Sequence, residues 1–458
     1  MSILNPLDGR YSAAVEKLAS LTGDEALFRR RIKTECDYFL ALSDLGLFGL
    51  NAKEKDLINK ISQNITPADI NIARLIEFKG YKNIKATNHD VKAVEYYLRL
   101  KFAGTSLENK TQWLHFALTS EDVNSVSYAL MIRDGLEQVL LPSLEEISGI
   151  LKRTARRYAS LVMLARTHGQ PAVPTTFGKE IKVFEYRLDR QLKALKKQEI
   201  SCKFSGAVGN YNAHVAAFEK IDWQKFSRKF IASLNKGHKT KIILFEVTDQ
   251  TDPHDTLAEL FDNLRRINVI LTDLSCDMWR YISDGLVSQK TVDGETGSST
   301  MPQKVNPINF ENAEGNMGLA NALFEFFSRK LPVSRLQRDL SDSTVMRNVA
   351  SAFGYCEVAW RSLIKGLNKS EPDAQACKNM LLSHPEVIAE ALQTVLRANG
   401  VSGAYEKLKN FTRGKKLTQK DIDAFIQSFD ISEKLKLKLA AQKTEKYIGT
   451  AVKTARKA

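Results

Sequence analysis

The stretch that decides the fold is residues 255–283, DTLAELFDNLRRINVILTDLSCDMWRYIS. Its apolar side chains recur at steps of three and four residues, which places them along one side of a helix of about eight turns. These apolar residues are Leu257, Leu260, Phe261, Leu264, Ile267, Ile270, Leu271, Leu274, Met278 and Ile282. A helix of this length exceeds the usual globular helix, so we predict a bundle in which helices also pack against other chains.

The rest of the chain carries a similar helical signal. Residues 179–198 have an apolar stripe between charged side chains, and residues 307–330 are expected to form a third long helix. The 24 glycines and 11 prolines are few for 458 residues, which disfavours a strand-and-turn architecture. Because one core rarely grows beyond roughly 250–300 residues, we predict an all-α fold in three domains, at 1–111, 112–365 and 366–458.

The charge balance is basic, since 67 Lys and Arg against 53 Asp and Glu give a formal charge of +14. Such an excess fits nucleic acid, an acidic surface or anionic substrates as partners. The basic residues are scattered among acidic ones, and no zinc finger, RNA-binding aromatic strand or basic zipper accompanies them. We therefore favour a solvated basic surface and expect no nucleic-acid partner.

The cysteines and the N-terminus indicate the compartment. Five cysteines lie far apart and never form a C-x-x-C pair, which predicts buried free thiols in a reducing compartment and no structural zinc. The first residues lack the charged and apolar regions of a secretory signal. No apolar run approaches the roughly 18 residues that a membrane span needs. We expect a cytoplasmic protein without a membrane partner.

One long stretch without helical spacing, residues 285–306 (GLVSQKTVDGETGSSTMPQKVN), lies inside the helical region. Glycines permit conformations that turn several backbone N–H groups toward one point, while Lys304 adds a positive charge and Asn306 an amide donor. Such a set suits the binding of a carboxylate or the lowering of a hydroxyl pKa. A flexible surface loop is the alternative, and composition alone leaves both open. We also expect residues 286–303 to be mobile without ligand and to close over a substrate.

The order of residues in this loop points to a family. GSSTMPQKVNP at 297–307 matches every fixed position of the pattern G-S-S-x-M-P-x-K-x-N-P, and so resembles the signature of the fumarase/aspartase superfamily. The continuation INFENAEGN at 308–316 resembles the bacterial adenylosuccinate lyase branch. Gln303 departs from the His of many relatives, at a position that the pattern leaves open.

A histidine motif lies at 167–171, THGQP, between a helix expected to end near Leu164 and one expected to begin near Lys179. His168 is not on an apolar stripe, and an imidazole with its usual pKa of about 6.5 is a natural general acid or base. A loop histidine with a structural hydrogen bond is the alternative. THGQP also resembles the catalytic-histidine motif of the family, which favours the catalytic role.

Two further motifs combine a helix start with a resemblance. TNHDVK at 87–92 predicts a helix N-terminus capped by Asn88 or Asp90, and resembles a substrate-contacting block of adenylosuccinate lyases. LTSEDVN at 118–124 predicts a capping box, and resembles the family segment that touches the succinyl group. The two roles are compatible, because a helix N-terminus attracts anions.

Three more segments complete the resemblance. DGRY at 8–11 is similar to the family motif that binds the nucleotide end, and Gln250 to a ligand-facing glutamine. SRLQRDLSDSTVMRN at 334–348 resembles the segment that holds the phosphate and purine. From the residues alone, Arg335 and Arg338 are equally well explained as ion-pair partners of the nearby aspartates.

The resemblance implies an enzyme that eliminates fumarate from a succinylated nucleotide. It gives adenylosuccinate as substrate with AMP as product, and the succinylaminoimidazole carboxamide ribotide SAICAR with AICAR as product. It implies Ser298 as the base, His168 as the acid, and no cofactor or metal. The residues that it assigns to substrate binding are Arg10, Tyr11, Asn88, His89, Asp90, Thr119, Ser120, Gln250, Lys304, Val305, Asn306, Asn312, Arg338, Ser343, Thr344, Val345, Met346 and Arg347.

The resemblance also implies a homotetramer with a twenty-helix core and active sites shared between subunits. Three other functions compete with this prediction. Another lyase of the superfamily, such as argininosuccinate lyase or aspartase, shares the signature loop but not the DGRY or TNHDVK motifs. A nucleic-acid-binding helical protein rests only on the net charge, and an inactive structural relative, like a lens crystallin, is disfavoured by the intact Ser298, His168 and Lys304.

Overall fold

The computed structural model describes residues 3–291, 300–301, 303–415 and 417–457. About 65% of the chain is helical and the described strands are short, which confirms the predicted all-α class. The helices in the first part of the chain are α1 (Ser12–Thr22), α2 (Asp24–Asp44), α3 (Ala52–Gln63), α4 (Pro67–Phe78), α5 (Asp90–Phe102), α6 (Ser120–Gly135), α7 (Leu141–Arg157), α8 (Phe177–Leu195), α9 (Asn212–Ala217) and α10 (Trp223–Ser233). A π-helical turn, Leu136–Leu140, connects α6 to α7.

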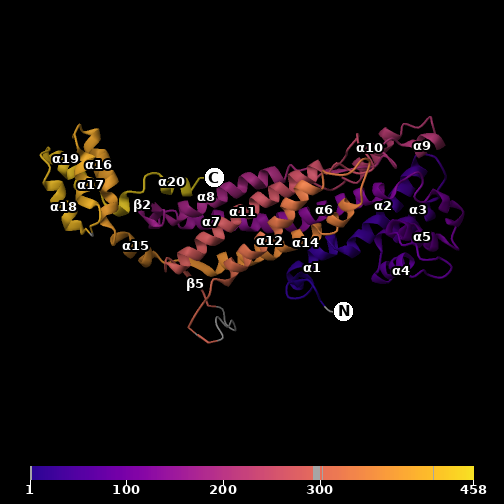
Figure 1. The fold of residues 1–458 in the computed structure, drawn as a ribbon, viewed down its shortest axis with the longest axis horizontal. Helices are drawn as coiled ribbons and strands as arrows, with labels where there is room; N and C mark the ends of the chain where they lie inside the picture. Colours follow the sequence, from indigo (N-terminus) through magenta and orange to yellow (C-terminus); the bar gives the residue numbers. More distant parts are fainter. Residues whose placement is uncertain (1–2, 292–299, 302, 416, 458) are drawn as a thin grey trace. The chain divides into compact units, whose positions relative to one another are not determined.

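The rest of the chain adds ten more α-helices to the described part, and Figure 1 labels some of the short strands. The later helices are α11 (Asp255–Ser283), α12 (Ile308–Lys330), α13 (Ser341–Met346), α14 (Val349–Lys369), α15 (Ala374–Leu382), α16 (Ala389–Ala398), α17 (Ala404–Thr412), α18 (Gln419–Gln427), α19 (Glu433–Ala440) and α20 (Ala451–Ala455). The strands are β1 (Val162–Thr167), β2 (Gln170–Thr176), β3 (Ile200–Cys202), β4 (Ile242–Leu244), β5 (Val287–Gln289) and β6 (Ser370–Pro372). They pair as β1–β2 and β5–β6, both antiparallel, and β3–β4, parallel.

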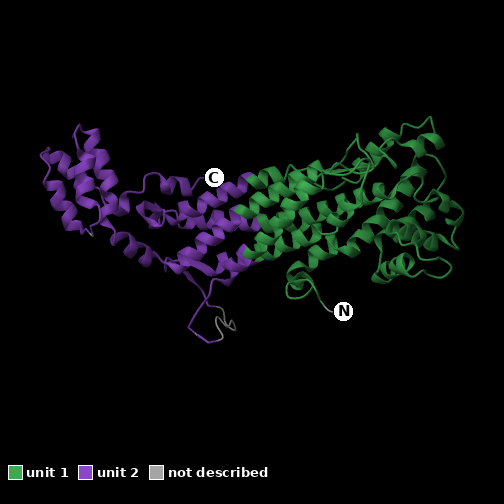
Figure 2. Cartoon of the chain, in the orientation of Figure 1, with its two compact units in different colours: residues 1–144, 191–269, 315–361 green, residues 145–190, 270–314, 362–458 purple. Residues whose placement is uncertain are grey.

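The chain divides into two compact units, which Figure 2 colours green and purple. Unit 1 consists of residues 1–144, 191–269 and 315–361, and unit 2 of residues 145–190, 270–314 and 362–458. In the described part of the chain, α7, α8, α11, α12 and α14 each have residues in both units. The units therefore do not follow the order of the sequence, and the three predicted domain boundaries stay a prediction.

The long helices were well predicted from apolar spacing. Helix α11 has the predicted bounds, and α12 begins one residue after the predicted start. Helix α8 begins two residues before the predicted residue 179 and ends three residues before 198. Along α11 the residues of the apolar stripe are buried except Ile282, which is half-buried near the helix end, and Leu260 and Leu271 are fully enclosed. The stripe is therefore the core-facing side of the helix.

The first part of unit 1 forms its own core. Helices α2, α3, α4 and α5 pack around aromatic and aliphatic side chains such as Phe39, Ile58 and Tyr97. At 21 residues, α2 is longer than α3, α4 and α5, which have 12, 12 and 13 residues. Its buried side includes Arg31 and Glu35 as well as apolar residues. Helix α2 thus brings charged groups into the interior, where they need partners.

The chain between α7 and α8 differs from the prediction. We expected a helix to end near Leu164, but α7 ends at Arg157 and the β1–β2 hairpin follows. Met163 and Leu164 are buried on β1, so the apolar run that suggested a helix is a buried strand. His168 and Gly169 have φ values of 52° and 72° and form the two-residue turn. Two consecutive left-handed residues are typical of a tight hairpin turn, where the second is commonly glycine.

Helices α16 to α19 of unit 2 pack around a separate small core that includes Leu392, Leu408 and Ile426. Among the described residues, four cysteines are buried and Cys276 is exposed, and all five are free thiols. The expectation that all thiols would be buried was therefore wrong for Cys276. No described helix combines the length and the low charge that crossing a membrane requires.

Candidate functional site

The N-terminus of α6 lies in a buried polar framework within unit 1. Thr119 caps the helix, and the Asp122 carboxylate accepts the backbone N–H of Thr119 at 2.8 Å, in the predicted capping box. The other Asp122 oxygen accepts from Lys203 Nζ at 2.6 Å and from the backbone N–H of Ser205 at 2.9 Å. Both side chains of the Asp122–Lys203 pair are fully buried. The pair fixes the start of α6, where Thr119 and Ser120 lie at the positive end of the helix dipole.

His89 and Ser120 bring two of the predicted binding segments together. His89 Nε2 lies 3.3 Å from Ser120 Oγ, and His89 Nδ1 accepts the backbone N–H of Lys92 at 3.3 Å. The cap of α5 is therefore His89, and the prediction of Asn88 or Asp90 as the cap was wrong. Asn88 has a φ of 47°, a left-handed conformation that turns the chain into the helix and excludes it from the capping position.

Asp90 is held between two arginines. Arg31 Nη2 lies 2.8 Å and Arg347 Nη2 2.7 Å from the same oxygen, Asp90 Oδ2. Arg31 is buried and also donates from Nε to Asn124 Oδ1 at 2.9 Å. Burial raises the pKa of Asp90, but the two guanidinium groups outweigh it and hold the pKa below its usual value. Two predicted binding residues, Asp90 and Arg347, thus form one charged group around a buried arginine.

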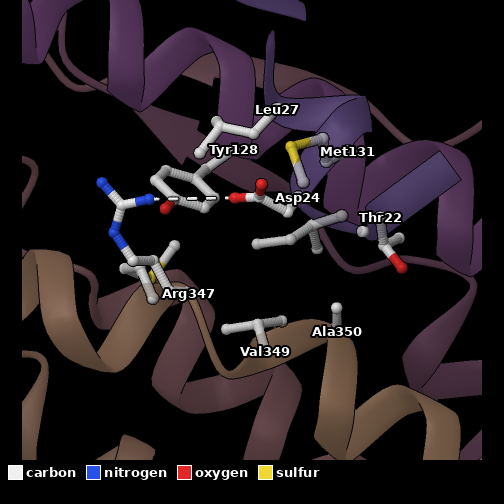
Figure 3. Close-up of a pocket in the computed structure, with 11 residues that line it drawn as sticks. Thr22, Asp24, Leu27, Tyr128, Met131, Arg347, Val349 and Ala350 are labelled. Atoms are coloured by element: carbon white, nitrogen blue, oxygen red, sulfur yellow. Dashed lines mark ion pairs between the residues drawn. The ribbon is translucent and has the colours of Figure 1, made fainter. Parts of the chain in front are cut away.

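A small cavity of about 40 Å³ lies beside Arg347 (Figure 3). Arg347 Nη1 lies 4.0 Å from Asp24 Oδ1, and the figure shows this ion pair beside Leu27 and Tyr128. The lining also includes Met346, another predicted binding residue. A cavity of this volume holds a few water molecules at most, so it does not hold a nucleotide.

Arg338 lies between two carboxylates. Its Nη2 lies 2.8 Å from Glu121 Oε2 on α6 and 3.5 Å from Asp342 Oδ2 on α13. The contact with Asp342 confirms the local alternative of a nearby aspartate partner, as does the 3.8 Å contact between Arg335 and Asp339. Burial raises the pKa of Glu121 to about 7, an effect that Arg338 opposes and Asp342 strengthens. The predicted phosphate-binding arginine is therefore fixed by a buried glutamate next to Ser120.

Other predicted binding residues of unit 1 are connected to Arg338 or Arg347 by hydrogen bonds of their neighbours or by position in the sequence. Gln250 donates from Nε2 to the Ala207 carbonyl at 3.0 Å, and its backbone N–H donates to Gln337 at 3.2 Å. Gln250 is thereby tied to the residue that precedes Arg338. Ser343, Thr344, Val345 and Met346 are on α13, where Val345 and Met346 are buried. Arg10 is exposed and Tyr11 half-buried, just before α1.

In unit 2, His168 occupies the β1–β2 turn and is exposed. Among the described residues its ring has no hydrogen-bond partner, so the structural alternative of a bonded loop histidine gains no support. A side chain of β1 stabilises the turn, because Arg166 Nη1 donates to the Gly169 carbonyl at 3.1 Å. The hairpin thus presents an exposed imidazole at its two-residue turn.

The signature loop also belongs to unit 2. Lys304 and Val305 are exposed, Asn306 is half-buried, and Asn312 is half-buried on α12. Gln289 Nε2 on β5 donates to the Val305 carbonyl at 3.3 Å, which ties the end of the loop to its beginning. Ser298 lies outside the described residues, as does the middle of the segment 286–303 for which we predicted mobility and closure.

The ion-pair roles of three residues were not predicted from the sequence. Arg31 and Glu121 hold Asp90 and Arg338, and Lys203 holds Asp122. A charged residue in a helix gives no sequence signal for its partner when that partner is far away along the chain. The one available signal was the position of Arg31 on the apolar side of α2, among Leu27, Phe28 and Ile32.

Family models match most of the chain. Residues 9–322 match a model described as "Lyase", and residues 334–448 match one described as "Adenylosuccinate lyase C-terminal". The two matches together include His168, the signature loop and Arg338. The first match spans more than half of the chain, and the chain is a lyase.

Similar proteins cover the full length of the chain. Proteins named "Adenylosuccinate lyase" are 42% identical in Haemophilus influenzae, over 100% of this chain and 98% of that protein, and 43% identical in Legionella pneumophila, over 98% and 97%. The protein of that name from Escherichia coli is 41% identical, over 99% and 97%.

Solved structures share the fold at low identity. A fumarate lyase from Mesorhizobium sp. BNC1 has a TM-score of 0.76 at 18% identity, with 96% of both chains covered. A 3-carboxy-cis,cis-muconate lactonizing enzyme from Pseudomonas putida has a TM-score of 0.73 at 19% identity, with 96% and 95% covered. The fold, the two family models and the full-length relatives agree, and the chain belongs to the adenylosuccinate lyase family.

Proposed function

We propose that this chain cleaves adenylosuccinate to AMP and fumarate, and SAICAR to AICAR and fumarate, in purine biosynthesis. The observation that carries the proposal is the arrangement at the start of α6. Ser120, at the positive end of the helix dipole, is followed directly by Glu121, which holds Arg338 at 2.8 Å. A donor set for a carboxylate and a guanidinium for a phosphate thus lie close together, as a succinylated nucleotide requires.

The first chemical requirement is removal of a proton from the carbon next to a carboxylate. We assign this step to Ser298, whose hydroxyl must first lose its own proton to solvent because a neutral serine is too weak a base near neutral pH. Lys304 provides the positive charge that favours the serine alkoxide, and Asn306 an amide donor for the substrate. Lys304, Asn306, Thr119 and Ser120 would stabilise the two negative charges of the resulting aci-carboxylate.

The second requirement is a proton for the departing nitrogen. We assign this role to His168, because its exposed ring on the hairpin turn is accessible to a substrate. When the C–N bond breaks, the bonding electrons go to the nitrogen of the nucleotide, which takes the imidazolium proton. The alkoxide of Ser298 has accepted the carbon-bound proton, so the two transfers balance and fumarate leaves with its new double bond.

The third requirement is a grip on the nucleotide. Arg10, Arg338 and Arg347 carry guanidinium groups, which bind phosphate oxygens through two parallel hydrogen bonds. Arg338 and Arg347 are already oriented by Glu121 and Asp90. Gln250 and the backbone of 343–346 complete the contacts that we assign to the purine side.

We further propose a cytoplasmic homotetramer that shares its active sites. Apolar side chains remain exposed on three long helices in the described part of the chain, and we assign them to contacts with other copies of the chain. They are Val183 and Tyr186 on α8, Val269 and Trp279 on α11, and Ile308, Leu319 and Phe326 on α12. Other copies of the same helices would cover them in a twenty-helix core.

The function is tested by following the absorbance of adenylosuccinate with purified protein and identifying the products by chromatography. AMP and fumarate in equal amounts are expected. Argininosuccinate and aspartate serve as control substrates, since turnover of either without turnover of adenylosuccinate would place the chain in another branch of the superfamily. Random DNA is added as a competitor, because strong salt-dependent inhibition would support the nucleic-acid alternative.

The assembly is tested by light scattering at micromolar concentration. A mass of about four chains is expected if the exposed apolar residues of α8, α11 and α12 are covered by other copies. A monomeric mass would contradict both the tetramer and the shared site.

A further inference from the structure

The Glu121–Arg338–Asp342 group of unit 1 carries more charge than its position in the interior favours. Glu121 and Asp342 have side chains that are 6% and 7% exposed, and Arg338 is 14% exposed. One guanidinium therefore balances two nearly buried carboxylates, and the group has one negative charge in excess when both are ionised. Charge that is buried without full compensation changes its protonation state readily.

The surroundings of the group do not remove the excess. Glu121 faces Arg338 and Asp342, Asn124 Nδ2 on its own helix at 3.4 Å, and more distantly Lys203. Lys203 forms its own fully buried pair with Asp122. Another neighbour is His254, which faces Arg338, Asp342, Asp252 and Asp255 and whose pKa burial lowers, so its ring is neutral near pH 7.

The hydrogen bonding of the group is also incomplete. Among the described residues, Arg338 Nε, Asp342 Oδ1 and both ring nitrogens of His254 are buried without a hydrogen-bond partner. His254 adopts a φ of 61°, and its carbonyl begins the hydrogen bonding of α11. A buried guanidinium with a free N–H group is unusual, because such groups are normally satisfied. Arg338 is thus held by one end and retains hydrogen-bonding capacity for another anion.

We propose that Glu121 is a positioning residue that holds Arg338 for the phosphate of the nucleotide and takes up one proton from solvent when that phosphate binds. This inference rests on the proposed function, which supplies the phosphate. The balance is simple: the phosphate brings two negative charges to a group with one already in excess, and one solvent proton adds to a Glu121 carboxylate oxygen. No other bond forms or breaks.

The direction of the coupling follows from electrostatics. Burial already raises the pKa of Glu121 to about 7, so the carboxylate is largely ionised at pH 7.5 in the free protein. A phosphate dianion on Arg338 weakens the attraction that Arg338 exerts on Glu121 and adds repulsion, and both effects raise this pKa further. Nucleotide affinity is therefore highest below pH 7 and falls as the pH rises through the pKa of the complex.

The experiment measures proton uptake by titration calorimetry of the full-length protein with AMP at pH 7.5, in buffers that differ in ionisation enthalpy. At this pH the phosphate is already a dianion, because its second pKa is about 6. Adenosine and fumarate are the matched ligands without phosphate. If AMP binding raises the pKa of Glu121 by about one unit, we expect the complex to take up about half a proton for each AMP bound. Binding of adenosine or fumarate should be accompanied by almost no proton uptake.

The variant Glu121→Gln keeps an oxygen that accepts from Arg338 but does not titrate. AMP should bind to it without proton uptake, and its Kd should change less than about twofold between pH 6.5 and 8.5, against about fivefold in the wild type. KM for adenylosuccinate should follow the same pattern while kcat changes little. Asp342→Asn is a second variant, in which the excess charge is removed and uptake should also fall.

Each outcome decides the question. Equal uptake for AMP and adenosine in the wild-type protein would overturn the inference without any variant. Unchanged uptake in Glu121→Gln would show that another group titrates and would also overturn it. If adenylosuccinate is cleaved but AMP binds without a linked proton, only this inference fails. If adenylosuccinate is not cleaved and AMP does not bind, the proposed function fails and this inference fails with it.

Discussion

The predicted binding residues of unit 1 and the predicted catalytic residues of unit 2 differ in how they are supported. In unit 1, Arg338 and Asp90 are enclosed by partners from distant segments, at 2.7–2.8 Å. In unit 2, His168 is on an exposed turn and Lys304 is exposed at the end of the signature loop. Arg338 and Asp90 are therefore oriented by protein partners alone, whereas the predicted catalytic His168 and the predicted binding residue Lys304 lack a comparable framework within their unit.

This difference has a chemical consequence. A serine base needs surroundings that change its pKa strongly, and such changes come from burial and nearby charge. An exposed lysine supplies charge that water and salt screen, and neither it nor an exposed histidine supplies burial. We infer that the surroundings of the catalytic groups are completed when other subunits and the substrate cover them, while the binding groups need no such help.

The largest expected effect is the loss of kcat when a predicted catalytic residue of unit 2 is replaced. His168→Ala should lower kcat by about 10²–10⁴-fold and leave substrate binding largely intact, because the imidazole acts on the departing nitrogen only as the bond breaks. Steady-state kinetics and equilibrium binding of adenylosuccinate measure the two quantities. His384→Ala is the matched control in the same unit, since His384 is paired with Glu386 and is not among the predicted site residues.

Ser298→Ala should have an effect of the same size on kcat, again with binding preserved. The hydroxyl acts on the reacting carbon, while affinity comes mainly from groups that hold the carboxylates and the phosphate. Single-turnover kinetics with excess enzyme separates chemistry from product release. A variant that retains more than about a tenth of the wild-type kcat would contradict the role of Ser298 as the base.

Lys304→Ala should lower kcat by about 10²–10³-fold and raise KM as well, since its charge serves both the base and a substrate carboxylate. This result would extend the comparison, because one residue of the signature loop would contribute both to catalysis and to substrate binding. Gln303→Ala is the control, at an adjacent exposed position that the signature leaves open. An effect on KM alone would restrict Lys304 to binding.

Arg338→Ala should raise KM by about 10–100-fold with little change in kcat, because phosphate is held alike in the ground and transition states. Circular dichroism should confirm an intact fold, since Glu121 can accept a proton when its partner is removed. Arg335→Ala is the matched control, three residues away and 85% exposed, and should leave KM unchanged. A large fall in kcat for Arg338→Ala would remove the distinction between the two regions.

The smallest expected effect concerns the stability of unit 1 itself. His115 Nδ1 lies 2.6 Å from the fully buried Glu35 carboxylate. Burial lowers the pKa of His115, but Glu35 outweighs it and the pKa is raised overall. A raised pKa means stability that is present below the unfolded-state value of about 6.5 and lost as the pH rises through the folded-state value.

Urea unfolding at pH 6 and pH 9 tests this pair. The wild-type chain should lose more unfolding free energy over that range than His115→Gln, which cannot be protonated. Equal losses in the two chains would mean that the pair does not contribute to stability, and that the buried charges of unit 1 are less coupled to folding than the distances indicate.

The sequence predicted the long helices well because their signal is local. The apolar residues of α11 recur over the whole helix, so its first and last residues could both be predicted correctly. The β1–β2 hairpin was missed because its apolar run, Val162 to Leu164, is too short to distinguish a strand from a helix. The positive φ of His168 that makes the turn is unusual outside glycine, and no local pattern predicted it.

The candidate site was predicted in part, for a similar reason. Motifs that are contiguous, such as THGQP and the signature loop, could be identified residue by residue. The partners that hold the binding residues are not contiguous: Glu121 and Arg338 are 217 positions apart, and Arg31 and Asp90 are 59 apart. Pairing across such separations is decided by the packing of α2, α6 and α13, which no local pattern records.

The most direct test of a site that is completed between subunits is complementation of two inactive chains. His168→Ala and Ser298→Ala chains are mixed, dissociated and reassembled, with subunit exchange verified by mass spectrometry of tagged chains. If one site takes His168 and Ser298 from different subunits, random assembly should restore about a quarter of the wild-type activity. No recovery after verified exchange would contradict the shared site, and with it the idea that neighbouring subunits cover the exposed catalytic residues.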